Sequence, residues 1–596
     1  MIDKYFLSLV FILFSVFSYY QQKQTDFSSR SPMRVVANQK EISEFNLGFE
    51  ALLSTHLNPW IILQDGFKLE IDTTDKVQGK NSYKFTNTFL ATEYEMCLFQ
   101  KILLPQLGRK VQISLFSKCD QLESAWMKIV GFDKNMIKVV SDSINIKNNM
   151  QWQKFTANLT YDDRICMVTI DIRVRETFKT KKRLVSFWLD NMSINIDELA
   201  ISQFANKSFD YSKNEIIEIN SNYQLNNNLE IPLEELSNIS KNKIIGFGET
   251  VHGSKEIHQA VFNNIQQLIS NFNCRLVLLE IPIETGLLLN QFVNEDVITD
   301  FQLDTIVSGF AVDTNIFTAF IKWVKFFNRS AENKVVIFGI DDYVNKDRPK
   351  SINRFILNKK LDSQVADSFL TIINKTYLRS KHLKFAENNA EHFATLLGKK
   401  DYLMLLQNLR IRTDTLCRLS PTWHDWKYLH RDYLMWQNAK FAIEQLTDSN
   451  TIVALWGHFS HLNKNTPSMF NDFYSLGQYL TLYFKDDYYL IGCLVGSGEI
   501  STWEINWKTK ITKKLGFPPG QSLEFLCNLS NAGNFLKSVS NVSERSCILR
   551  NIGAVLHENS QFEPLSIKGS MNEFIFIERS TSADVSIIKP NIRKLL

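Results

Sequence analysis

Short apolar runs recur along the C-terminal part of the chain, and acidic or histidine residues follow each of them. The runs are residues 243–248, 275–279, 334–339 and 451–456. They are rich in Val, Ile and Leu and have helix-like sequence before or after them, which is typical of buried parallel strands. Open parallel sheets bind ligands outside the carboxyl ends of their strands. The residues that follow these runs are therefore candidates for an active site.

The region before these runs has a different pattern, in which apolar and polar side chains alternate with turn residues in between. The alternating segments are residues 110–116, 126–130, 167–172 and 185–194. This pattern predicts an antiparallel β-sandwich, a jelly roll, over residues 34–200. The polar residues 201–228 lack a helical or strand period and are predicted to be a linker. Residues 229–590 are expected to form an α/β domain: a mostly parallel sheet flanked by helices, with a helical insertion at roughly residues 350–447.

The N-terminus carries an apolar segment that is too short for a comfortable membrane span. Lys4 precedes apolar residues 5–17, and polar residues 21–24 follow. This order fits the hydrophobic region of a secretory signal, so we expect residues 1–22 to be a signal peptide. The protein is then expected in the periplasm, in the cell envelope or outside the cell. Since no A-x-A cleavage site is present, an uncleaved N-terminal segment could provide a membrane contact.

Composition narrows the class of protein further. The chain has 596 residues, 44% of them hydrophobic and 22% charged, as expected for a globular protein with two or more domains. The formal net charge of +4 is small for this length, and no basic cluster is interleaved with aromatics, so nucleic acid is not an expected partner. The eight cysteines contain no C-x-x-C pair, which argues against zinc-ribbon and thioredoxin-like sites.

The chemistry indicated by the sequence centres on Glu249 and His252, which lie between two glycines. A neutral imidazole is a natural general base near neutral pH, and a nearby carboxylate can fix its tautomer and stabilise the imidazolium. The chain has no G-x-S-x-G elbow and no Ser-x-x-Lys motif of the penicillin-binding pattern that would supply a nucleophile. We therefore expect His252 to activate a water molecule that attacks an ester carbonyl.

Other polar residues near the strand ends complete the predicted site. A charge at a buried strand end, such as Glu280, needs a partner, although it could also cap the following loop. Arg431 could clamp a carboxylate or stabilise an oxyanion, or form a surface pair with its neighbour. The catalytic candidates are His252, Glu249, Glu280, Arg431 and His458. The substrate-binding candidates are His461, Asp432, Asp341 and His258.

A metal site is the main alternative for the same residues. His458 and His461, three residues apart, could bind a metal together with the Glu and His groups named above. No H-E-x-x-H helix is present, so the spacing gives little support to a metal. We expect no cofactor, and a divalent metal stays the alternative.

Several motifs, in this order along the chain, resemble those of the erythromycin esterase family. Residues 248–253, GETVHG, resemble its GE-x-x-HG motif, residues 431–435 its Arg-Asp-x-x-Met stretch, and residues 458–461 its His-Asn-x-His motif. The resemblance covers roughly residues 229–590. It implies a hydrolase whose motif histidine, here His252, acts as the base without a covalent intermediate. The chain departs from the family in having Phe459 where Asn is usual and, in the helix after GETVHG, fewer basic residues.

The N-terminal region resembles the galactose-binding-like jelly rolls that accompany exported hydrolases, through its N-x-GFE opening and its closing W-L-D-N stretch. Trp60, Trp152 or Trp188 could stack on sugars, although a structural role is favoured. The sequence thus predicts a hydrolase of a carboxylic ester or lactone. Its substrate is expected to be a small-molecule ester or an envelope or glycan-linked ester. The alternatives are a metal-dependent peptidase or amidase and an inactive glycan-binding protein.

Overall fold

The structure of the protein is a computed structural model. It describes residues 47–49, 61–65, 67–87, 93–103, 110–120, 122–133, 138–160, 165–177, 184–200, 223–307, 314–341, 348–359, 364–375, 379–411, 431–465, 474–503, 510–516, 518, 522–530, 532–542, 546–554 and 562–583. The predicted signal peptide, residues 1–22, and Trp60 lie outside these ranges. Within these ranges, no helix is long and apolar enough to cross a membrane.

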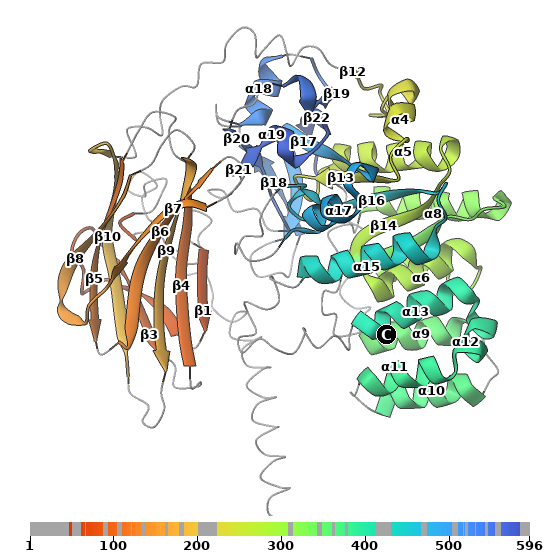
Figure 1. Ribbon diagram of the computed structural model, residues 1–596, viewed down its shortest axis with the longest axis horizontal. Coiled ribbons are helices and arrows are strands. Elements are labelled where there is room, and N and C mark those ends of the chain that lie inside the picture. Colours follow the sequence, from red (N-terminus) through yellow and green to blue (C-terminus); the bar gives the residue numbers. More distant parts are fainter. Residues whose placement is uncertain are drawn as a thin grey trace, which may run out of the picture.

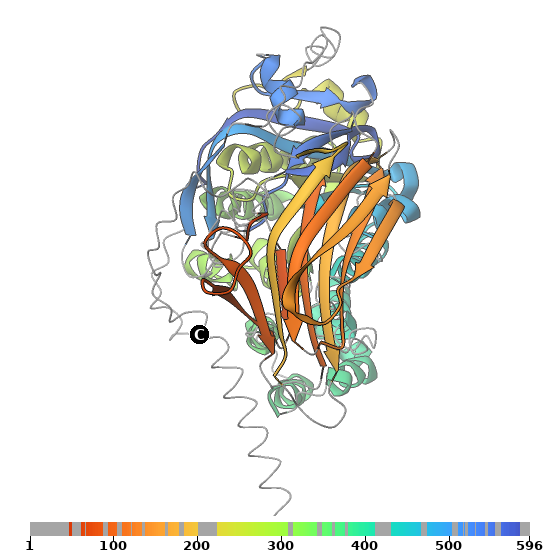
Figure 2. The same ribbon diagram turned by 90° about the vertical axis from the view of Figure 1, so that its left-hand side faces the viewer.

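The N-terminal strands form two antiparallel sheets (Figure 1). Their bounds are β1 (Ile61–Asp65), β2 (Phe67–Asp72), β3 (Ser82–Asn87), β4 (Glu93–Leu103), β5 (Lys110–Asp120), β6 (Ser124–Asp133), β7 (Lys138–Asn145), β8 (Asn149–Thr160), β9 (Ile165–Thr177), β10 (Ser186–Ile196) and β11 (Leu199–Ala200). Among the described strands, one sheet has the order β1-β4-β9-β6-β7 and the other β2-β3-β10-β5-β8, with β11 paired to β10. Figure 2 shows the strands of this region in red to orange. Both sheets contribute to one apolar core, for example through Ile113 of β5 and Ile170 of β9. The predicted antiparallel β-sandwich is confirmed.

Trp188 illustrates how the alternation of β10 divides its side chains between core and outer face. Phe187, next to it, is fully buried in the sandwich core. Trp188 itself is 7% exposed, and its Nε1 donates to Asp72 Oδ2 at 3.1 Å. The ammonium groups of Lys84 and Lys118 lie 4.9 and 4.3 Å from its ring centroid. These contacts leave little of the ring for a sugar, which is consistent with the structural role that we favour.

The C-terminal strands form a second, mostly parallel sheet. Their bounds are β12 (Tyr223–Gln224), β13 (Ile244–Glu249), β14 (Cys274–Pro282), β15 (Val336–Asp341), β16 (Ile452–His458), β17 (Tyr488–Trp503), β18 (Lys510–Leu515), β19 (Phe535–Ser538) and β22 (Glu573–Ser580). The described order is β12-β19-β22-β17-β13-β16-β14-β15, with β18 on β17. All neighbours from β22 to β15 are parallel. The four apolar runs are β13 to β16, so the expected parallel sheet is confirmed. β12 falls inside the predicted linker and pairs with β19.

Helices flank this sheet, as expected for parallel strands that are buried on both faces (Figure 1). They are α4 (Leu233–Ile239), α5 (Lys255–Asn271), α6 (Ile283–Asn294), α7 (Asp300–Val307), α8 (Asn315–Ser330), α9 (Arg348–Asn358), α10 (Gln364–Lys375), α11 (Arg379–Asn388), α12 (Ala390–Leu397), α13 (Lys399–Ile411), α15 (Arg431–Leu446), α16 (Phe459–Leu462), α17 (Leu476–Phe484), α18 (Leu523–Leu529) and α19 (Ile567–Ser570). Two 3-10 turns, η2 (Lys485–Asp487) and η3 (Val539–Asn541), and the antiparallel pair β20 (Ser546–Arg550) and β21 (Phe562–Ser566) complete the described elements. The predicted helical insertion corresponds to α9–α13 and α15.

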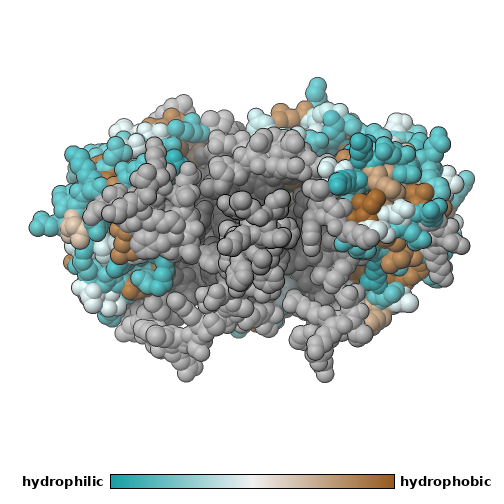
Figure 3. Space-filling model, turned by 90° about the horizontal axis from the view of Figure 1, so that it is seen from below, coloured by the Kyte–Doolittle hydropathy of each residue, from teal (hydrophilic) through white to brown (hydrophobic). Residues whose placement is uncertain are grey.

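The described surface seen from below is mostly hydrophilic (Figure 3). Hydrophobic residues interrupt it in smaller areas on the side of the C-terminal helices. Leu357 of α9, for example, is 62% exposed. Single exposed apolar side chains are normal on soluble domains, so they do not by themselves define a docking surface.

Candidate active site

The parallel strands bring charged and histidine residues to one edge of the sheet. Glu249 closes β13, and His458 lies opposite it at the end of β16. Glu280 of β14 and Asp341 of β15 belong to the next two strands in the sheet. All residues of β13 and β16 are buried, so these strands are rigid supports for the side chains at their ends. The register therefore explains why groups separated by about two hundred positions meet.

Glu249 and His252 form a hydrogen-bonded pair. His252 lies in the turn between β13 and α5, and its Nδ1 is 2.7 Å from Glu249 Oε1. An ionised carboxylate only accepts, so Nδ1 donates and Nε2 is left to take up a proton. Burial alone would raise the pKa of Glu249, but the charge and hydrogen bonds of His252 and His258 lower it to about 2. Burial opposes the charged form of His252, yet Glu249 and Glu280 outweigh it and raise the pKa of His252.

His458 lies beside His252, and its surroundings disfavour protonation of its ring. The two ring centroids are 4.6 Å apart. The Nε2 of His458 is 3.1 Å from the carbonyl oxygen of Ile552, and its Nδ1 is 2.7 Å from Ser460 Oγ. A carbonyl only accepts, so Nε2 carries the hydrogen and Nδ1 accepts from the Ser460 hydroxyl. Burial and the neighbouring His252 lower the pKa of His458 to about 3, so this ring is neutral.

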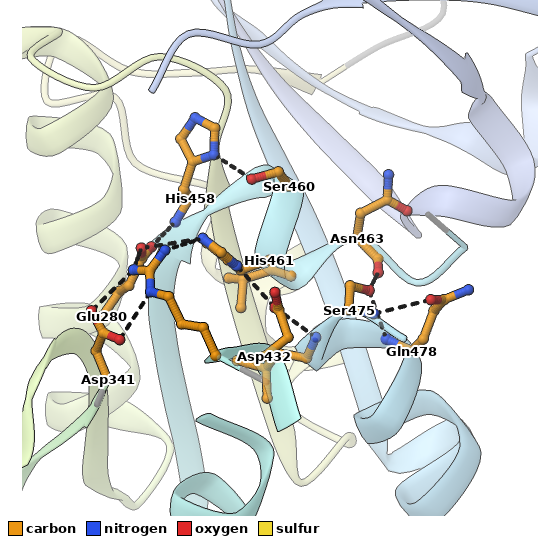
Figure 4. Close-up of polar contacts among 12 residues, drawn as sticks. Glu280, Asp341, Asp432, His458, Ser460, His461, Asn463, Ser475 and Gln478 are labelled. Atoms are coloured by element: carbon orange, nitrogen blue, oxygen red, sulfur yellow. Dashed lines mark hydrogen bonds and ion pairs between the residues drawn. The ribbon is translucent and has the colours of Figure 1, made fainter. Parts of the chain in front are cut away.

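Arg431, at the start of α15, bonds to Glu280 of β14 and Asp341 of β15. Figure 4 labels these two carboxylates. The Nε and Nη2 of Arg431 donate to the two oxygens of Asp341, each at 3.0 Å. Nη2 also donates to Glu280 Oε1 at 2.7 Å, and Nη1 lies 2.8 Å from His461 Nε2. Although burial disfavours the charged guanidinium, Asp341 and Glu280 raise the pKa of Arg431 above its usual value. Arg431 therefore holds other site residues in place.

His461 and Asp432 extend this network towards α17 (Figure 4). Since Arg431 can only donate, His461 Nε2 accepts from it, and His461 Nδ1 donates to Asp432 Oδ1 at 2.9 Å. Asp432 Oδ1 also accepts from the backbone N–H of Leu476, the first residue of α17, at 3.0 Å. The other oxygen of Glu280, Oε2, accepts from the N–H of His458 at 2.6 Å, which links this network to the first histidine pair.

Of the predicted substrate-binding residues, His258 lies deepest. The structure brings it to Glu249, with 3.1 Å between His258 Nε2 and Glu249 Oε2. His258 is, however, 0% exposed. By contrast, the side chains of His252 and His461 are 14% and 17% exposed. In this arrangement His258 has no surface for a substrate, and its described hydrogen bonds are to Glu249 and Thr314.

Some residues of the site carry no sequence signal of their own. The carbonyl of Ile552 accepts from the N–H of His252 at 3.1 Å as well as from the ring of His458. Ser460 and Thr314 bond to the rings of His458 and His258. A backbone carbonyl is present in every residue, so no residue type could have pointed to Ile552. Only Ser460 stood inside a motif that the sequence analysis identified.

Phe459, which stands where the resemblance expects Asn, is a packing residue. It is 2% exposed. A Cβ added at Gly248 would lie 3.0 Å from its Cδ2, and one added at Gly492 would lie 3.3 Å from its Cε2. Phe459 therefore occupies the space that side chains on β13 and β17 would need. The neighbouring His458 and His461 keep their side-chain hydrogen bonds to Ser460 and Asp432 in the presence of this ring.

The described residues contain no group of three or more His, Cys, Asp or Glu side chains that could hold a metal ion. Both oxygens of Glu249 already accept from histidines, and both nitrogens of His458 have hydrogen-bond partners. The residues of the site are thus arranged as a hydrogen-bonded network. Within it, Nε2 of His252 is placed to take up a proton.

The fold and the site define a mixed α/β protein with a Glu–His pair at the carboxyl edge of a parallel sheet. The erythromycin esterase family profile matches residues 269–580, more than half of the chain. The protein therefore belongs to the erythromycin esterase family, as the sequence motifs predicted. The match begins after Glu249, His252 and His258, so the first motif lies outside the matched residues. Membership of this family supports a hydrolase function.

Two solved structures with TM-scores above 0.5 share the fold over 63% and 64% of this chain. A protein from Bacillus cereus has a TM-score of 0.52 and 17% sequence identity, over 63% of this chain and 100% of that chain. For a succinoglycan biosynthesis protein the TM-score is 0.51 and the identity 16%, over 64% of this chain and 100% of that chain. A mutant of the erythromycin esterase EreC in its open conformation has a TM-score of 0.43 and 14% identity, covering 61% and 98% of the two chains. No curated protein matches the chain.

Proposed function

We propose that the protein hydrolyses a carboxylic ester or lactone by attack of a water molecule that His252 activates. The observation that carries this proposal is the 2.7 Å hydrogen bond between Glu249 Oε1 and His252 Nδ1. It fixes the tautomer that leaves Nε2 free to accept a proton, and the raised pKa of His252 makes the ring a stronger base. Family membership supports the hydrolase class, and the ester chemistry and the base are our inference.

The reaction then proceeds in two proton transfers at Nε2 of His252. Water attacks the carbonyl carbon while one of its protons passes to Nε2, and the carbonyl becomes a tetrahedral oxyanion. Glu249, which is 1% exposed, stabilises the imidazolium in its low-dielectric surroundings. When the carbon–oxygen bond of the ester breaks, Nε2 returns the proton to the leaving alkoxide. The products are a carboxylic acid and an alcohol, or one hydroxy acid from a lactone.

The Arg431 network supports this reaction by holding its neighbours. Three nitrogens of Arg431 are engaged by Asp341, Glu280 and His461. In turn Glu280 fixes the backbone of His458. We infer that the network keeps His458 and His461 at the edge of the site, where they contact the substrate beside His252. Because His458 is neutral, it adds no second positive charge beside the imidazolium of His252. Repulsion between two like charges would destabilise that imidazolium.

We further propose that the substrate is a small-molecule ester or an ester linked to envelope or glycan material, met outside the cytoplasm. The apolar segment at residues 5–17 and the accessory β-sandwich support this setting. They give no support to a nucleic-acid partner. Membrane contact would then come only from the N-terminal segment, if it is not cleaved.

The test is hydrolysis of a panel of activated esters, acetylated glycans and macrolactones by the full-length protein, with and without a chelator. Activity on at least one ester that survives chelation would agree with the proposal. Activity that is lost to the chelator and restored by one divalent metal would instead identify a metal-dependent hydrolase. If all esters and lactones remain intact while a glycan binds, the protein is a binding protein that lacks hydrolase activity.

A further inference from the structure

Behind Glu249 lies a histidine that the proposed reaction does not use. His258, on the first turns of α5, is fully buried. Its Nε2 is 3.1 Å from Glu249 Oε2, and its Nδ1 is 3.4 Å from Thr314 Oγ1. We propose that His258 is a positioning residue, which holds Glu249 in the orientation that serves His252 and thereby sets how readily His252 takes up a proton. This inference rests on the proposed function of His252 as the base.

The donors and acceptors in this chain of contacts assign the tautomer of His258. Glu249 accepts through Oε1 from His252, so its second oxygen, Oε2, accepts from Nε2–H of His258. The Nδ1 of His258 is then an acceptor, and the hydroxyl of Thr314 donates to it. The same Thr314 Oγ1 accepts from the N–H of Phe317 at 3.2 Å, as the N-cap of α8. The hydrogen bonds thus run from the start of α8 through His258 to the carboxylate.

Aromatic packing holds the ring of His258 in this orientation. The ring of Trp456 meets it edge to face, with centroids 5.7 Å apart and planes at 90°. The ring of Phe262 lies 6.1 Å away at 61°. Glu249 is 1% exposed, so water does not replace a lost hydrogen bond at Oε2 easily. A carboxylate oxygen left without a partner there would be costly, which makes His258 more than a space-filling side chain.

The hydrogen bond from His258 acts on His252 through the charge of Glu249. This hydrogen bond stabilises the carboxylate of Glu249 more when His252 is neutral than when His252 is a positively charged imidazolium. Without it, the Glu249–His252 pair would hold its proton more tightly, and His252 would become deprotonated only at higher pH. Glu280, His461 and His458 also face His252, and they stay unchanged when His258 is replaced.

The experiment compares His258→Phe, which keeps an aromatic ring but has no donor, with His258→Gln, which keeps an N–H donor. Phe262→Leu is the matched control, because it loosens the packing beside His258 without touching the hydrogen bonds. In each full-length protein the titration of His252 is followed by 15N NMR, and kcat and KM are measured against pH. For His258→Phe we expect the midpoint of His252 to rise by about one pH unit. Below that midpoint kcat should fall about tenfold, because a smaller fraction of His252 is deprotonated. We expect a smaller change in His258→Gln and no change of midpoint in Phe262→Leu.

A folded His258→Phe variant in which His252 titrates as in the wild type would overturn the proposal. If this variant does not fold, the tautomer in the wild type decides: we expect a hydrogen on Nε2 of His258, and a hydrogen on Nδ1 would overturn the inference. The NMR midpoint needs no substrate. A protein that shows the predicted shift but hydrolyses no ester would therefore refute the proposed function while leaving the coupling of His258 to His252 intact.

Discussion

Replacing Glu249 by Gln tests the electrostatic basis of the proposed base. The substitution keeps the size of the side chain and one oxygen for His252, but it removes the negative charge. Burial and the two histidines together move the pKa of Glu249 from its ordinary value of 4.5 to about 2. This difference corresponds to roughly 3 kcal/mol of net stabilisation of the ionised form.

The same interaction that stabilises ionised Glu249 also stabilises the imidazolium of His252. Removing the charge of Glu249 should therefore slow the reaction. If most of the roughly 3 kcal/mol also stabilises the transition state, kcat/KM falls about a hundredfold. The direction of the pH effect follows from the raised pKa of His252 in the wild type. The base works only when it is deprotonated, so the acid limb of kcat/KM lies above its ordinary position. In Glu249→Gln no negative charge stabilises the imidazolium of His252, so the pKa of His252 falls. The acid limb of kcat/KM therefore moves to lower pH.

The assay is kcat/KM between pH 5 and pH 9 on the fastest ester found, for the wild type and Glu249→Gln. Circular dichroism and thermal unfolding show whether both proteins are folded at each pH. An acid limb at the same pH in both proteins would refute the idea that Glu249 raises the proton affinity of His252. A loss smaller than about threefold would equally show that the charge contributes little to catalysis.

Three further outcomes follow from the structure. Arg431→Lys should lower kcat/KM at least about tenfold, measured by steady-state kinetics, because a single ammonium cannot replace the two-pronged pairing with Asp341; unchanged kinetics would contradict this. Since the pKa of Glu249 is depressed, its contribution to stability is complete above its ordinary value of 4.5 and is lost as pH falls to about 2. Urea unfolding of Glu249→Gln should therefore depend less on pH in this window, and parallel curves would count against it. Gly248→Ala places a Cβ 3.0 Å from Phe459, so we expect unfolding free energy to fall by about 1–3 kcal/mol; an unaltered thermal midpoint would show that the ring gives way.

The parallel sheet could be predicted because its strands are buried on both faces. Such strands are continuous apolar runs, and each of the four runs became one strand, from β13 to β16. Once the strands are parallel, their carboxyl ends share one edge. The meeting of Glu249, Glu280, Asp341 and His458 at that edge follows from the topology. An acidic or histidine residue at the end of an apolar run was therefore sufficient to identify each of these side chains.

The partners of these side chains could not be predicted in the same way. The carbonyl of Ile552, which bonds to both His252 and His458, lies 300 residues from His252 and 94 from His458 in sequence. Long-range hydrogen bonds to the backbone leave no pattern of residue types. For Arg431 the sequence left open a role towards the substrate and a surface pair with its neighbour, and the structure shows its guanidinium bonded to Asp341 and Glu280. Charge alone does not tell whether a cation faces a ligand or other side chains.

The same limit applies to His258 and to the predicted linker. The sequence analysis named His258 as a substrate-binding candidate, and the fold shows that it faces Glu249 from behind and is fully buried. Tyr223 and Gln224 read as polar linker, yet they form β12, because pairing with β19 supplies hydrogen bonds that a short polar segment cannot secure by itself.

The most direct test of the central claim is the kcat/KM of His252→Ala relative to the wild type, on the fastest ester and at the pH optimum. If His252 is the base that activates water, the variant should be folded and lose about a thousandfold in kcat/KM, and added imidazole should restore part of the rate. A folded His252→Ala variant that keeps kcat/KM within about tenfold of the wild type would show that another group performs the proton transfer.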